Sequence, residues 1–102
     1  MNRKASERLR ASPNFSLTFD FDGRPYVAKD TEPYPQYWLS ERDRLLLAMF
    51  SSRRGTTVDD AVDAYFRLTG AKRSASERNK SVKAVEAMLA AGVIVSMQGD
   101  TS

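Results

Sequence analysis

The sequence predicts an α+β domain in which a three-stranded antiparallel sheet precedes three helices in a winged-helix-like arrangement. Two patterns lead to this prediction. Apolar and polar residues alternate with a period of two only before residue 40, and helix-capping signals follow after it. A length of 102 residues suits one domain with a modest core. We expect a disordered basic arm at 1–12, the folded domain at 13–97 and a disordered tail at 98–102.

The strands are predicted from alternation and turn chemistry. Apolar and polar residues alternate from Phe15 to Phe21, which is typical of a strand with one buried face. Asp22-Gly23 follows as a hairpin signal, because both turn positions favour positive φ. Residues 24–29 form the return strand, and 36–39 form a short aromatic third strand after a connector that contains two prolines. The outer edge of such a sheet is open to a further strand.

The helices are predicted from their caps and stops. Gly70 is a natural left-handed stop for the second helix, and Gly92 ends the third. Glu77 completes a capping-box pattern at the start of the third helix. Residues 93–95 are expected to fold back as an apolar clip. The capping hydroxyls that begin the three helices are Ser40, Thr57 and Ser74.

Composition narrows the classes of function. The chain has no Cys and no His, so thiolate chemistry, Cys-based zinc sites and the commonest general base are missing. We therefore expect a protein that is not an enzyme and that uses no cofactor and no metal. The net charge of +3 is concentrated in the basic arm. The N-terminus has no apolar run of the secretory type, and no apolar run spans a membrane, so a cytoplasmic protein is expected.

Four stretches together resemble one known family. They are Tyr37-Trp38-Leu39-Ser40, the apolar run at 45–50, Gly55-Thr-Thr-Val-Asp-Asp-Ala-Val62, and the segment 85–95 that ends in Gly-Val-Ile-Val. Their order and spacing resemble the RiPP recognition element, the PqqD-like domain that binds precursor peptides. The resemblance covers residues 15–96.

The resemblance implies a non-catalytic module of natural product biosynthesis. It would bind the leader peptide of a ribosomally synthesised precursor and present it to a peptide-modifying enzyme. The leader would dock as an added strand on the third strand, in a cleft closed by the third helix. The expected partners are thus the leader and the enzyme, with no nucleic acid and no membrane, and the protein itself would be a monomer or a homodimer. The peptide-binding residues implied are Tyr34, Gln36, Tyr37, Trp38, Arg78, Ser81, Val82 and Val85.

Other interpretations of the same residues stay open. Tyr37 and Trp38 also suit core or rim packing, because aromatic residues dominate small cores. Arg78, Lys80 and Lys83 also suit a solvated helix face. The same basic residues could belong to the recognition helix of a winged-helix DNA-binding transcriptional regulator, although no basic hairpin follows that helix to act as a wing. A third interpretation is an adaptor that contacts only a protein partner through the sheet edge.

Overall fold

The computed structural model describes residues 7–29, 36–70 and 72–97 and has an α+β fold with three helices and antiparallel sheets. Tyr34 and the predicted tail at 98–102 lie outside the described residues. The α+β prediction is confirmed, but the prediction of a single sheet is incomplete. In chain order the elements are β1 (Leu9–Ala11), β2 (Phe15–Phe19), β3 (Pro25–Lys29), β4 (Gln36–Trp38), α1 (Glu41–Ala48), α2 (Val58–Thr69), α3 (Ala75–Ala90) and β5 (Ile94–Ser96).

The larger sheet has the order β2-β3-β4, with both pairs antiparallel. Leu17 lies opposite Val27, and Val27 lies opposite Tyr37, so these three residues share the face toward the helices. The predicted hairpin forms between β2 and β3, but its turn is wider than the sequence suggests. Asp20 Oδ1 accepts hydrogen bonds from the backbone N–H groups of Asp22 and Arg24, at 2.9 Å each, and thereby holds the loop in shape.

The smaller sheet pairs β1 with β5, which corrects the prediction that all strands precede the helices. The prediction of a disordered arm is wrong for Leu9–Ala11. Leu9 is fully buried, and its N–H and C=O bond to Thr56 at 2.9 and 2.8 Å. The segment continues into Ser12, whose N–H donates to the carbonyl of Val93 at 2.8 Å. Both sides of β1 are thus hydrogen-bonded, which fixes this segment within the fold.

The three predicted N-caps are confirmed, with one change of detail. The hydroxyls of Ser40, Thr57 and Ser74 each accept a hydrogen bond from the backbone N–H three residues later. The reciprocal capping box occurs at α1, where Asp43 Oδ2 accepts from the Ser40 N–H at 3.1 Å. At α3 the Glu77 carboxylate instead meets Arg42 of α1 at 2.9 Å. That ion pair connects the first and third helices.

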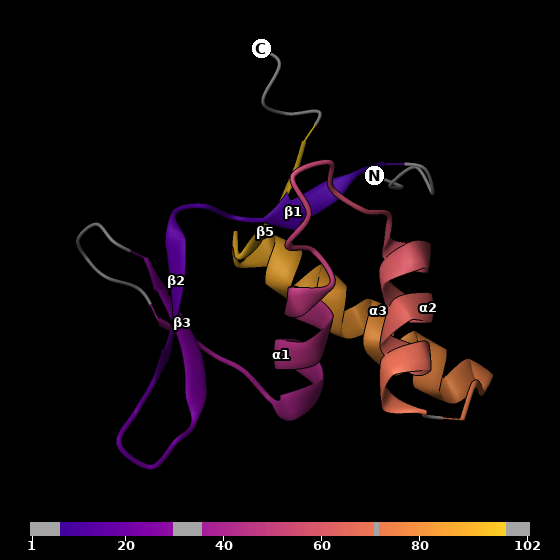
Figure 1. The fold of residues 1–102 in the computed structure, drawn as a ribbon, viewed down its shortest axis with the longest axis horizontal. Coiled ribbons are helices and arrows are strands. Elements are labelled where there is room, and N and C mark those ends of the chain that lie inside the picture. Colours follow the sequence, from indigo (N-terminus) through magenta and orange to yellow (C-terminus); the bar gives the residue numbers. More distant parts are fainter. Residues whose placement is uncertain (1–6, 30–35, 71, 98–102) are drawn as a thin grey trace.

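The helices and the small sheet enclose most of the core. Figure 1 shows the β2-β3 hairpin on one side of α1, with α2 on the other side and the β1-β5 pair across one end. The larger sheet contributes Val27 to the buried core, with Leu39 following directly after β4, whereas β2 contributes no buried residue. The core residues are Leu9, Val27, Leu39, Leu46, Phe50, Ala61, Val62, Tyr65, Phe66, Val85, Met88, Val93 and Ile94.

Candidate functional site

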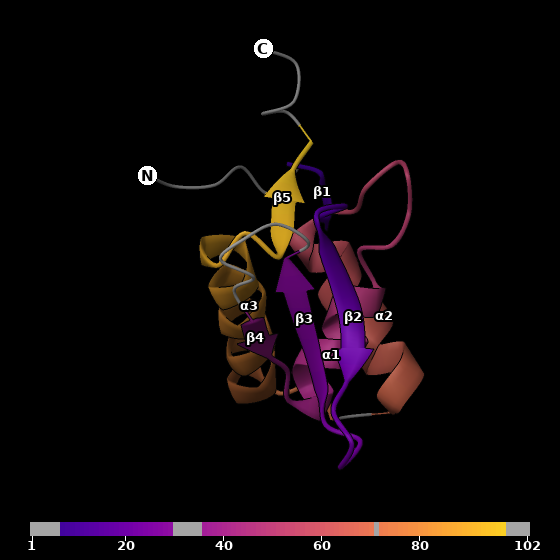
Figure 2. The same ribbon diagram turned by 90° about the vertical axis from the view of Figure 1, so that its left-hand side faces the viewer.

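The β4 strand is one outer strand of the larger sheet. Viewed with the sheet toward the reader, β4 is drawn in front of α3, and β2 forms the opposite edge (Figure 2). The N–H of Leu39 donates to the carbonyl of Pro25 at 3.1 Å. Since backbone groups alternate sides along an antiparallel strand, Tyr37 bonds toward β3, whereas Gln36 and Trp38 turn their N–H and C=O outward. An extended peptide can pair with those outward groups.

An aromatic pair with a cation covers the solvent face of the sheet beside this edge. Trp38 is 44% exposed, and its ring lies 4.8 Å from that of Tyr26, centroid to centroid. The guanidinium of Arg24 lies 5.0 Å from the Trp38 ring centroid, within the range of a cation–π contact. Trp38 is therefore a surface residue, and the interpretation of it as core packing does not hold. Sequence reasoning missed Arg24 and Tyr26, although strand register could have placed them near Trp38.

Tyr37 has a different environment from its neighbour. Its side chain is partly buried against the core on the helix side of the sheet. Burial raises the pKa of the Tyr37 hydroxyl above its usual 10.0, and the nearby Asp43 carboxylate raises it further. The phenol is thus neutral at physiological pH and can donate one hydrogen bond.

Arg78 faces α2. Its two terminal nitrogens lie 2.6 Å from Asp59 Oδ1 and 3.2 Å from Asp63 Oδ1. The hydrogen bond with Asp59 raises the pKa of the Arg78 guanidinium, burial opposes that effect, and Asp63 adds to it. Asp59 also lies in the first turn of α2, where a carboxylate favours the positive end of the helix dipole. Arg78 is therefore engaged with the carboxylates of α2.

The other predicted residues of α3 contribute mainly to packing. Ser81 and Val85 are both fully buried, and the Ser81 hydroxyl donates to the carbonyl of Glu77 at 3.0 Å. Val82 is partly buried against the core and lies one helical turn beyond Arg78, on the side of α3 that faces α2. Of the predicted site, Gln36, Tyr37 and Trp38 thus lie together on one strand, Val82 and Val85 belong to or pack against the same core cluster as Tyr37, and Arg78 is engaged with α2.

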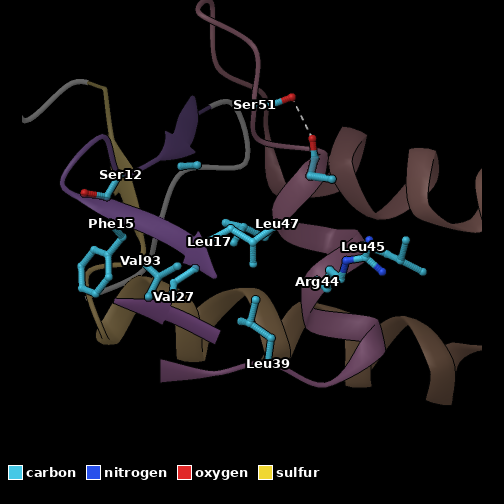
Figure 3. Close-up of a pocket in the computed structure, with 12 residues that line it drawn as sticks. Ser12, Phe15, Leu17, Val27, Leu39, Arg44, Leu45, Leu47, Ser51 and Val93 are labelled. Carbon is cyan, nitrogen blue, oxygen red and sulfur yellow. Dashed lines mark hydrogen bonds between the residues drawn. The ribbon is translucent and has the colours of Figure 1, made fainter. Parts of the chain in front are cut away.

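A pocket lies at the other edge of the sheet, where the sequence predicted no site. It has a volume of about 360 Å³ and is largely apolar. Figure 3 shows that Leu17 and Val27 approach it from the sheet, whereas Leu47 approaches it from α1. Among the described residues that line it, Arg44 is the one with a charge. The apolar alternation of β2 and the apolar stripe of α1 can be read from the sequence. The sequence does not show that these two surfaces leave a pocket between them.

The described residues contain no cluster of carboxylates that could hold a metal ion. In the same part of the chain no helix is long and apolar enough to cross a membrane. Compared with protein-family models, with curated proteins and with solved structures, the chain matches none.

Proposed function

We propose that this protein is a non-catalytic, cytoplasmic peptide-binding module of winged-helix-like topology. It binds the leader region of a ribosomally synthesised precursor peptide and presents it to a peptide-modifying enzyme. The observation that carries the proposal is the outer position of β4, whose outward backbone groups adjoin the exposed Trp38. The resemblance of the segments at 37–40, 45–50, 55–62 and 85–95 to RiPP recognition elements supports the same function.

In this proposal the leader is an added antiparallel or parallel strand next to β4. Its backbone bonds to Gln36 and Trp38, and its alternate side chains fall on the two faces of the sheet. Those on the solvent face meet the Trp38 ring, where Arg24 favours a carboxylate. Arg78, whose guanidinium already contacts Asp59 and Asp63, is left to hold α3 against α2.

A DNA-binding function has less support from the described residues. The cations of a recognition helix must be available to phosphates and bases. On α3, Arg78 is paired with two carboxylates of α2, and Lys80 lies 3.7 Å from Glu77. These ion pairs reduce the positive field of the helix face that DNA would contact.

The test is titration with a synthetic leader of the precursor encoded nearest this gene. Binding in the micromolar range or tighter, about −8 kcal/mol, is expected by calorimetry, together with a change in Trp38 fluorescence. Backbone N-methylation of alternate leader residues should weaken binding at least tenfold, because it removes the donors that an added strand uses.

A matched pair of variants locates the site. Trp38→Ala should weaken binding, whereas Phe21→Ala should not, although Phe21 is 99% exposed on the adjoining hairpin. Leader binding that both variants leave unchanged would place the peptide elsewhere. If the protein binds duplex DNA in a salt-sensitive manner and does not bind the leader, the function as a DNA-binding transcriptional regulator is favoured instead.

A further inference from the structure

The β2 strand is a sheet edge without the usual protection. Proteins protect outer strands with charges, prolines or bulges, because an uncovered edge pairs with other chains. Phe15–Phe19 contains no charged residue and no proline, whereas the neighbouring β3 begins with Pro25 and ends with Lys29. Among the described residues, β3 is the only strand neighbour of β2. At five residues, β2 is also a longer edge than the three-residue β4.

The outward groups of β2 can be assigned from the hairpin. The Asp20 N–H donates to the Arg24 carbonyl at 3.1 Å, so the even-numbered residues of the strand bond toward β3. Leu17 and Phe19 consequently turn their backbone N–H and C=O groups away from β3. Their side chains are each 49% exposed, and Leu17 lines the pocket of about 360 Å³ beside α1. The same edge thus offers both hydrogen-bonding groups and uncovered apolar surface.

We propose that β2 pairs antiparallel with β2 of a second copy of this chain, about a twofold axis through Leu17. In this register each residue of β2 lies opposite a residue of similar type in β2 of the second copy. Leu17 meets Leu17 of the second copy, Phe15 meets Phe19, and Ser16 meets Thr18. All apolar side chains then lie on one face of a continuous sheet, and the pockets of the two copies adjoin.

The residues that flank β2 also suit this register. Asn14 lies opposite Asp20 of the second copy, so an amide meets a carboxylate. If the pairing continues outward, Pro13 faces Phe21, whose side chain is 99% exposed in the single chain. No two like charges are directly opposed between residues 13 and 21. A one-residue shift in register would put apolar residues opposite hydroxyls and is disfavoured.

Electrostatics favour the antiparallel over the parallel pairing. The Arg44 guanidinium lies 5.6 Å from the Phe19 ring centroid, near one end of β2. Antiparallel pairing puts the two Phe19 residues at opposite ends, four residues apart, which is about 13 Å along the strands. That separation exceeds the Debye length of about 8 Å at physiological ionic strength. Parallel pairing would put the two Arg44 side chains near each other.

This interface leaves both β4 edges at the outer ends of the combined sheet. The proposal does not depend on what β4 binds, and failure of leader binding would leave it intact. If both proposals hold, each dimer has two peptide sites that face away from each other.

The first experiment is sedimentation equilibrium of the full chain from micromolar to millimolar concentration. The expected mass rises to twice the 11.4 kDa of one chain. Hydrogen exchange of the unmodified protein at both concentrations should show slower exchange of the Leu17 and Phe19 amides in the concentrated sample. A mass of one chain throughout, or a dimer in which these amides exchange at unchanged rates, would overturn the proposal.

Charge variants provide the second experiment. Leu17→Lys places like charges opposite each other on the twofold axis, and we expect a monomer with an unchanged circular dichroism spectrum. The control is Leu68→Lys, the same exchange at a position on α2 that is 60% exposed, and this variant should remain dimeric. Mixing Leu17→Lys with Leu17→Glu should restore a dimer that contains one of each. A dimer that persists in Leu17→Lys would contradict the assigned interface.

Discussion

Replacement of Leu9 by alanine tests whether the N-terminal segment belongs to the fold. The side chain is fully buried between the small sheet and the helices. Removing its methyl and methylene groups forfeits about 2.4 kcal/mol of transfer free energy, at about 0.8 kcal/mol for each of about three groups. The cavity left behind brings the expected loss of unfolding free energy to about 3–4 kcal/mol. Domains of this size have about 5–15 kcal/mol in total.

Thermal and urea unfolding followed by circular dichroism measure this loss. A change of about 3 kcal/mol corresponds to a fall in Tm of about 12–24 °C in a domain of this length. Phe21→Ala is the control, because its side chain is 99% exposed and should change Tm little. If Leu9→Ala lowers Tm no more than Phe21→Ala does, the segment is a dispensable arm and the assignment of β1 to the core is wrong.

Three further predictions follow from local geometry. Gly55→Ala should lower the free energy of unfolding by more than about 2 kcal/mol, because φ is +72° and a Cβ would lie 2.9 Å from the Leu9 carbonyl oxygen. The control is Gly23→Ala, where φ is +82° but the space is open, and its loss measured by urea unfolding should be about 1 kcal/mol. Spectrophotometric titration should place the pKa of Tyr37 above 10.0, so that stability due to its neutral form is complete below pH 10.0 and lost as pH rises through the folded-state pKa. Arg78→Met should lower the free energy of unfolding by less than about 1 kcal/mol, because the ion pairs of Arg78 are solvent-exposed, and this loss should shrink in high salt. A loss of stability that does not depend on salt would indicate that Arg78 acts through packing instead.

The sequence predicted the elements that local chemistry determines. The caps at Ser40, Thr57 and Ser74 and the hairpin near Gly23 depend on residues within a few positions of one another. They could therefore be found without knowledge of the tertiary structure. The burial in β4 likewise alternates along the strand, with Tyr37 partly buried between the exposed Gln36 and Trp38.

The small sheet could not be predicted in the same way. Leu9 stands between Arg8 and Arg10, and a three-residue strand gives too little alternation to be distinguished from a basic arm. Leu9 pairs with Thr56 and Ser96, which are far from it in sequence. The pairing therefore depends on how the helices arrange those two segments. The contacts of Arg78 have the same origin, because the spacing of basic residues on α3 says nothing of which helix lies opposite.

The pairing of β1 with β5 also bears on when this chain can fold. Leu9 is synthesised before any of the three helices. Ser96, the strand partner of Leu9, is synthesised only after all three. The β2-β3-β4 sheet and α1 can form while synthesis continues, since their partners are near in sequence. Until β5 emerges, however, β1 lacks its strand partner and the core that contains Leu9 is incomplete. We therefore expect the nascent chain to stay sensitive to protease until β5 has left the exit tunnel.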